Sequence, residues 1–222
     1  MRALLLFALP CLAAQTLQPF VVDHFARRDS KADVSFLLDA PAGKHGFIRE
    51  SGGHLVHDAG CIRFWGVNVT GWVKGSELLP PKEDAALWAA ELGRLGINCV
   101  RFHFLDRTTK QIPRGLIDGA REDSRTFDPQ QLDRLDYFVH QLKIRGIYSD
   151  LNLNVGRDYK AGDGVPDSNL IQQAKAMTYI GPRLLDLQRE YARMLLTHYN
   201  PYTQSEYRNE PAVAIVELVN EN

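Results

Sequence analysis

The sequence predicts an α/β fold in which parallel strands alternate with amphipathic helices. Residues 82–95, 128–142 and 182–198 carry apolar side chains three and four positions apart, the spacing of a buried helix face. Short apolar runs at 62–69, 97–104, 147–153 and 212–219 separate and flank these helices, as buried strands do. Alternation of strand and helix then predicts parallel pairing through right-handed crossovers.

The segment 15–62, before the first of these strands, has a different pattern. Short apolar or alternating runs at 20–22, 34–38, 47–49 and 54–56 predict strands. Glycines at 52 and 53 separate the last two runs, and glycine supplies the positive φ that a tight hairpin needs. Such a segment can be a small separate domain or a lid on a larger one. We expect it to cap one end of the larger domain.

The three helices show start and stop signals. Apolar positions Ala85, Trp88, Leu92 and Leu95 share one face of the first helix, and Gly96 ends it. Asp128 and Pro129 provide an N-cap and a first-turn proline for the second helix. Its apolar stripe comprises Leu132, Leu135, Val139 and Leu142, and Gly146 ends it. The third helix carries Leu184, Leu187, Tyr191 and Met194 on one face.

The lengths of the connections favour a barrel over a doubly wound sheet. Long loops at 70–81, 105–127 and 154–181 all follow strands, as the active face of a (β/α)8 barrel requires. A nucleotide-binding sheet shares this asymmetry, but residues 66–71 lack its Gly-x-Gly core. A complete barrel needs about 250 residues and eight strands. Residues 63–222 supply about four, so we expect the amino-terminal half of a barrel, truncated after strand four and aggregation-prone alone.

Composition and the amino terminus bound the class of protein. Lys and Arg number 26 against 27 Asp and Glu, a net charge of -1 without a basic cluster, so we expect no nucleic-acid partner. Residues 1–14 combine a positive tip, a short apolar run and small residues, which is typical of a signal peptide, although a buried first strand or helix is the alternative. No later run has transmembrane length. We therefore expect a secreted or periplasmic protein without a membrane anchor.

After cleavage at residue 14, only two cysteines would remain. Cys61 and Cys99 are too few for a disulfide framework, so stability must come from an apolar core. Cys99 lies in the apolar run 97–100, which predicts an inert buried thiol rather than a nucleophile.

Polar residues interrupt the apolar strands near their carboxyl ends, where barrel enzymes place their chemistry. These residues are Asn68, Arg101, His103, Asp150, Asn152, Asn154, Asn220 and Glu221. Arg101 and His103 are two positions apart, so both project to one face of their strand. There they can bind sugar hydroxyls or keep a carboxylate ionised, because a nearby cation lowers the pKa of a carboxyl group.

Other interpretations of these residues stay open. Arg101 can instead form a structural ion pair with Asp150 or Glu217. His103, Asp106 and Asp150 can bind the metal of a metal-dependent barrel hydrolase, but the expected His-x-His pair is absent and we expect no metal or other cofactor. Trp72 and Tyr159 lie in long loops, where an aromatic ring stacks on a sugar or packs locally.

Four segments in order along the chain together carry a resemblance to a known family. They are FWGVN (64–68), GINCVRFH (96–103), RGIYSDLN (145–152) and VAIVELVNEN (213–222). They resemble the clan A glycoside hydrolases, nearest to the cellulase-like family 5, and the match covers roughly residues 46–222. The Asn-Glu pair alone would be a weak signal, whereas four strand-end motifs in the right order are specific.

This resemblance implies a retaining glycosidase on a (β/α)8 barrel, acting on a poly- or oligosaccharide. It implies that Glu221 is the general acid/base, that Asn220 holds the sugar 2-hydroxyl and that Arg101 supports a nucleophile on strand seven, beyond this chain. His103 matches a frequent substrate contact. Asn68, Asn152, Asn154 and Trp72 are the remaining expected substrate-binding residues.

The third strand departs from the pattern of the family. Close relatives tend to carry histidine there, but this chain reads Asn152-Leu153-Asn154, which leaves that substrate contact open. A non-catalytic carbohydrate-binding barrel and a metal-dependent hydrolase are the alternative functions. The sequence predicts neither the glycan nor the oligomeric state.

Overall fold

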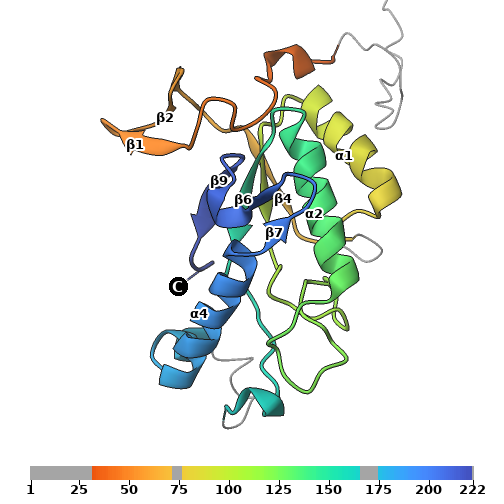
Figure 1. The fold of residues 1–222 in the computed structure, drawn as a ribbon, viewed down its shortest axis with the longest axis vertical. Helices are drawn as coiled ribbons and strands as arrows, with labels where there is room; N and C mark the ends of the chain where they lie inside the picture. Colours follow the sequence, from red (N-terminus) through yellow and green to blue (C-terminus); the bar gives the residue numbers. More distant parts are fainter. Residues whose placement is uncertain (1–31, 72–76, 166–174, 222) are drawn as a thin grey trace, which may run out of the picture.

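The computed structural model describes residues 32–71, 77–165 and 175–221 (Figure 1). Three of the sequence-based expectations concern residues outside these ranges: the signal peptide at 1–14, the strand at 20–22 and the substrate contact at Trp72.

A parallel four-stranded sheet forms the centre of the fold, as predicted. Its order is β4-β5-β6-β9, with every neighbouring pair parallel. The strands are β4 (Gly66–Val69), β5 (Cys99–Phe102), β6 (Tyr148–Asn152) and β9 (Val213–Glu217). They are joined by α1 (Lys82–Arg94), α2 (Pro129–Lys143) and α4 (Pro182–Leu196). The α/β class and the half-barrel order of strands and helices are confirmed.

Local signals explain where the helices begin and end. The Asp128 carboxylate accepts hydrogen bonds from the backbone N–H groups of Gln130 and Gln131, so it caps α2 as predicted. Gly146 has φ of 80°, the left-handed conformation that glycine adopts without steric cost. The predicted face of α1 is wrong at Leu95, which is the C-cap residue and is 47% exposed. No helix in the described ranges is long and apolar enough to span a membrane.

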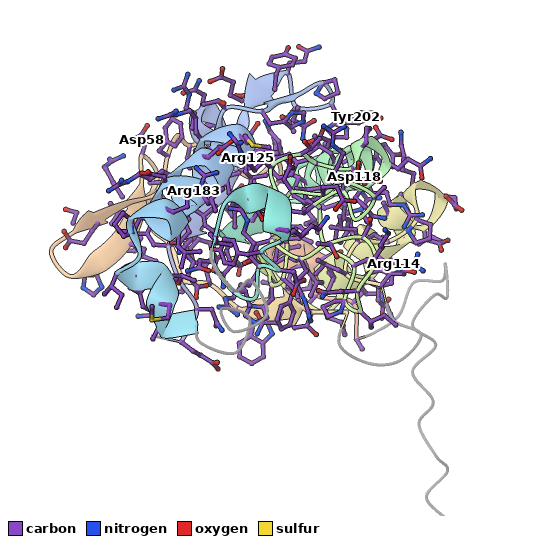
Figure 2. The ribbon with its side chains drawn as sticks, turned by 90° about the horizontal axis from the view of Figure 1, so that it is seen from below. Asp58, Arg114, Asp118, Arg125, Arg183 and Tyr202 are labelled. Carbon is purple, nitrogen blue, oxygen red and sulfur yellow. The ribbon has the colours of Figure 1, made fainter. Side chains whose placement is uncertain are left out.

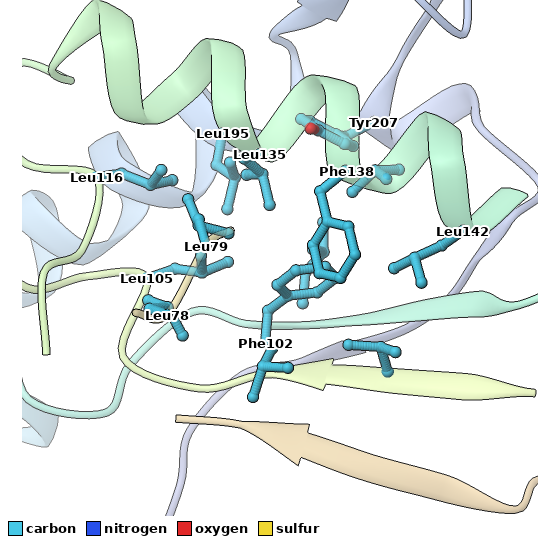
Figure 3. Close-up of a cluster of buried hydrophobic side chains, with 14 of the residues drawn as sticks. Leu78, Leu79, Phe102, Leu105, Leu116, Leu135, Phe138, Leu142, Leu195 and Tyr207 are labelled. Atoms are coloured by element: carbon cyan, nitrogen blue, oxygen red, sulfur yellow. The ribbon is translucent and has the colours of Figure 1, made fainter. Parts of the chain in front are cut away.

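The main core lies between the sheet and the helices that cover it. Phe102 on β5 and Phe138 on α2 are both fully buried and meet edge to face, with 5.9 Å between ring centroids. Figure 3 shows this pair between α2 and the strands, surrounded by leucines from several loops and helices. The cluster includes Leu105, Leu116, Leu135, Leu142 and Leu195. Burial of these side chains on one face of each strand fixes which residues face the other way.

A small antiparallel sheet lies towards the end of the strands opposite the long loops and projects to one side of the molecule (Figure 1). It comprises β1 (Arg49–Ser51), β2 (His54–His57) and β3 (Gly60–Cys61), paired in that order. Gly52 and Gly53 have φ of 60° and 79° in the β1–β2 turn, as the hairpin prediction requires, whereas β3 was not predicted. Apolar residues flanking this sheet pack on Cys99, Tyr148 and Ala212, which start or precede three of the parallel strands.

Two segments differ from the sequence-based expectations. The strand predicted at 34–38 is wrong: residues 35–37 form the 3-10 helix η1 (Ser35–Leu37). The Asp33 carboxylate accepts a hydrogen bond from Ser35 N and favours a turn, while Phe36 stays 79% exposed. An unpredicted hairpin, β7 (Tyr199–Asn200) with β8 (Ser205–Glu206), precedes the 3-10 helix η4 (Tyr207–Asn209) between α4 and β9.

Candidate active site

The predicted polar residues gather on the inner face of the sheet, away from the helices. In the strand register, Asn68 lies opposite Arg101, and Arg101 lies opposite Asp150. Asn152 lies opposite Glu217 on the next pair of strands. Their chain neighbours Phe102 and Leu151 belong to the apolar core. Because side chains alternate along a strand, the polar set shares the other face.

Arg101 lies at the centre of this face and donates to four side chains. Its Nε and Nη2 each donate to one carboxylate oxygen of Glu217, both at 2.6 Å. Nη2 also donates to Asn220 Oδ1 at 2.9 Å. Nη1 donates to Asn68 Oδ1 at 3.2 Å and to His103 Nδ1 at 3.0 Å. We call these five residues the Arg101 cluster. The pairing with Glu217 is one of the two ion pairs that the sequence left open.

The partners of His103 fix its hydrogen-bonding state. A guanidinium group can only donate, so the contact with Arg101 requires a lone pair on His103 Nδ1. The Asn152 amide nitrogen lies 3.4 Å from the same atom, further away than Arg101, which takes the single lone pair of Nδ1. A neutral imidazole then carries its hydrogen on Nε2. The shared face predicted for Arg101 and His103 is confirmed, and Asn152 lies beside them.

Asp150 is a buried carboxyl group within this polar face. Burial, followed by the negative charge of Glu217, raises its pKa to about 6, and the nearby Arg101 charge offsets part of the shift. Its Oδ1 atom has no hydrogen-bond partner among the described residues. Arg101 pairs with Glu217 and not with Asp150. Hydrogen bonds to Glu217 are also the main reason that the pKa of Arg101 is raised.

Asn220 and Glu221 follow β9 at the carboxyl end of the sheet. The backbone N–H of Asn220 donates to the carbonyl oxygen of Asn154 at 3.0 Å, which ties this turn to the end of β6. Glu221 is exposed and has φ of 52°, an uncommon conformation for a residue other than glycine. Its negative charge contributes to the raised pKa of Arg101, but less than the hydrogen bonds and the charge of Glu217 do. The structure thus brings Asn220 and Arg101 into contact, and Glu221 is the next residue along the chain.

The two long loops around the site are tied to each other by buried charges that the sequence did not predict. Asp106 is fully buried, and its Oδ2 accepts from the backbone N–H groups of Val155 and Gly156. Arg157 donates to Ser124 Oγ and to the carbonyl oxygens of Ser124 and Leu187. These contacts join residues about 30 to 50 positions apart in sequence, a separation over which no local pattern operates.

Two further residues of these loops bear on the predicted site. Asn154 is buried, and its amide donates to Thr178 Oγ1 at 3.3 Å, so the 3-10 helix η3 (Lys175–Tyr179) reaches the rim of the site. Tyr159 is 2% exposed and lies against the Arg157 guanidinium, so its ring packs locally rather than facing a ligand. Figure 2 looks onto this end of the molecule, where Arg183 lies on α4 and Arg125 lies beside that helix.

The residues considered as metal ligands do not converge. His103 Nδ1 faces Arg101, and Asp106 faces the backbone of the neighbouring loop. Within the described ranges, no group of three or more His, Cys, Asp or Glu side chains is arranged to hold a metal ion. Cys99 is buried, and burial raises the pKa of its thiol to about 12, which matches the inert thiol predicted.

Comparison with known proteins gives the fold of the chain. No protein-family model matches it, and no curated protein sequence does. The endo-1,4-beta-mannanase from Rhizomucor miehei superposes with a TM-score of 0.62 at 19% identity, over 80% of this chain and 49% of that one. A glycoside hydrolase family 5 mannosidase from the same organism gives 0.59 at 13% identity, over the same shares. The chain has the fold of half a family 5 glycoside hydrolase.

This half-barrel accounts for the order of the elements described above. The chain spans about half the length of the solved structures it matches, while most of its own residues take part in the match. That is the outcome expected from four parallel strands, where a complete barrel has eight. The fold and the likeness to family 5 structures, predicted from the four strand-end motifs, are confirmed by this comparison.

Proposed function

We propose that this chain is the acid/base half of an exported, retaining glycoside hydrolase that cleaves O-glycosidic bonds in a poly- or oligosaccharide. The observation that carries the proposal is the contact between Arg101, on the inner face of a half-barrel, and Asn220, which follows β9 and directly precedes Glu221. The solved structures it resembles are a mannanase and a mannosidase. Oligosaccharides with β-1,4-linked mannose are therefore the first substrates to assay.

The chemistry asks for two carboxyl groups with different tasks. Glu221, carrying a proton, would donate it to the glycosidic oxygen as the bond to the leaving sugar breaks. A second carboxylate, about 5 Å away, would attack the anomeric carbon and form a covalent glycosyl-enzyme. Glu221, now ionised, would take a proton from the water that releases the sugar. Asn220 would hold the sugar 2-hydroxyl during both steps.

The second carboxylate would come from residues outside this chain. The resemblance puts the nucleophile after strand seven, and the chain supplies four parallel strands. We therefore expect no turnover from the 222 residues alone. Export rests on residues 1–14, and the mass of the protein recovered outside the cytoplasm would show whether they are removed.

Replacement of Glu221 by Gln in the full-length protein tests the proposal. Without an acid, cleavage of a substrate with a poor leaving group should fall by about 10²- to 10⁴-fold, because general acid catalysis contributes about that much. An aryl glycoside with a good leaving group needs no acid in the first step of its hydrolysis. The variant should therefore keep much of the parent's rate for that step. Azide, which attacks without a general base, should then speed release of its sugar.

Glu122→Gln is the matched control. Glu122 is exposed in a loop at the same end of the molecule but lies outside the Arg101 cluster, so this variant should keep full activity. Unchanged hydrolysis by Glu221→Gln would contradict the proposal. Sugar binding without any turnover by the full-length protein would favour the non-catalytic carbohydrate-binding barrel instead.

A further inference from the structure

All hydrogen-bond donors of Arg101 are in use. A guanidinium group has five N–H bonds: one on Nε and two on each terminal nitrogen. The structure gives Nε one acceptor, Nη1 two acceptors and Nη2 two acceptors. Each N–H bond thus has its own partner within the Arg101 cluster. In this arrangement the donors of Arg101 are used within the cluster, so the role of Arg101 that the structure shows is to hold these neighbours in place.

The Arg101 guanidinium also fixes the orientation of the side-chain amides of Asn220 and Asn68. Because Arg101 can only donate, it requires the carbonyl oxygen of the Asn220 side chain, which accepts from Nη2 at 2.9 Å. Asn68 likewise turns its Oδ1 towards Nη1. The NH₂ group of each amide is then on the side away from the guanidinium. An Asn220 amide held this way presents its NH₂ group as a donor to a ligand hydroxyl.

Glu217 fixes the plane of the guanidinium. It accepts from Nε and Nη2 with its two oxygens, a bidentate geometry that allows one orientation of the Arg101 plane. The pair reaches from β5 to β9 across β6, and both side chains are about a quarter exposed, at 23% and 27%. Glu217 uses the Nε donor and one Nη2 donor of the guanidinium. The other Nη2 donor then points at Asn220, and the two Nη1 donors point one at Asn68 and one at His103.

We propose that Glu217 is a positioning residue of the site: through Arg101, it sets the direction in which Asn220 donates to a bound sugar. The inference rests on the proposed function, because it assigns Asn220 to the 2-hydroxyl of the substrate. Glu217 itself touches neither the reacting atoms nor the sugar. Its removal should therefore weaken one particular substrate contact rather than the acid/base chemistry of Glu221.

Glu217→Gln in the full-length protein isolates this effect. Gln keeps the size of the side chain but replaces one carboxylate oxygen by an NH₂ group, which donates, so it cannot accept with two oxygens from Arg101 Nε and Nη2. Hydrolysis is measured for a substrate and for its 2-deoxy analogue. In the parent protein, the analogue should react at least about tenfold more slowly, a loss of about 1.4 kcal/mol. In Glu217→Gln, the ratio of the substrate rate to the analogue rate should shrink towards one, as it should in Asn220→Ala.

A purely structural role for Glu217 would lower the amount of folded protein and leave the ratio unchanged, and that result would overturn the inference. If Glu217→Gln does not fold, Glu217→Asp decides by the same ratio, because Asp keeps both acceptors at a shorter reach and should give an intermediate value. A parent-like ratio in Glu217→Asp would then count against the inference.

Failure of the proposed function looks different. Glu221→Gln should slow hydrolysis of the substrate and of its 2-deoxy analogue by a similar factor, so it should leave the ratio of the two rates unchanged. A full-length protein that hydrolyses neither compound would contradict the proposed function. A Glu221→Gln variant that hydrolyses both compounds normally would contradict it too. A normal Glu221 effect combined with an unchanged ratio in both Glu217 variants would remove only the inference about Glu217.

Discussion

The two faces of the parallel sheet are built on different physical principles. On the outer face, Phe102 and Leu151 are fully buried under helices, and burial of apolar area stabilises the contact without regard to direction. On the inner face, Arg101 and Glu217 hold their neighbours by hydrogen bonds of fixed geometry. The difference teaches that stability and site geometry can be altered separately, even at adjacent residues of one strand.

Phe102→Ala should have the largest effect on stability. The ring is fully buried against Phe138, and replacing a buried Phe by Ala costs about 3–5 kcal/mol, because apolar burial is lost and a cavity remains. Urea denaturation of the dilute chain measures the change. Phe36→Ala is the control, since that ring is 79% exposed and its loss should cost less than about 0.5 kcal/mol. Equal costs for the two variants would contradict the division between the faces.

Asp150 should make the inner face sensitive to pH. Its pKa is raised to about 6 in the folded chain, mainly by burial, against about 3.9 for an unfolded Asp. As pH rises from about 4, the unfolded chain loses this proton first, while the folded chain keeps it until about pH 6. The free energy of unfolding should therefore fall over this interval, by up to about 3 kcal/mol, and stay low above it.

Asp150→Asn removes this dependence, because an amide does not titrate. Relative to the parent, the variant should gain stability between pH 4 and pH 7, as measured by urea denaturation at both values. Asp158 in the loop after β6 also has its pKa raised to about 6 by burial, so Asp158→Asn should show the same sign. A difference between Asp150→Asn and the parent that is the same at both pH values would show that Asp150 ionises normally in the folded chain.

The sequence predicted the outer face well because its signals are local. Helix stripes repeat within one or two turns, and caps such as Asp128 and Gly146 act on the next few backbone groups. Strand alternation likewise predicted that Arg101 and His103 share a face. These features follow from short-range geometry, so they can be derived before any tertiary contact is known.

Partner choice on the inner face could not be derived in the same way. The sequence left Asp150 and Glu217 as equal candidates for Arg101, and the choice depends on a register shift between Ser149 and Asp150 where β6 pairs with β9. The approach of Thr178 to Asn154 depends on how a long loop returns to the site. Both are long-range outcomes that residue patterns do not encode.

Arg101→Met should have the smallest effect on stability of these three changes, although it removes the centre of the site. Met keeps much of the apolar stem but leaves Glu217 without its bidentate partner. Breaking a fully buried ion pair costs about 3–5 kcal/mol, but both side chains here are about a quarter exposed, so water replaces part of the loss and we expect about 1–3 kcal/mol.

Arg125→Met is the matched control for this change. Arg125 also donates to both oxygens of one carboxylate, Glu190, but the pair lies at the surface, with 43% and 31% exposure. An exposed pair contributes about 0–1 kcal/mol, so urea denaturation should rank Phe102→Ala above Arg101→Met and Arg101→Met above Arg125→Met. If Arg101→Met instead cost as much as Phe102→Ala, the polar face would help hold the fold, and the two faces would no longer be separable.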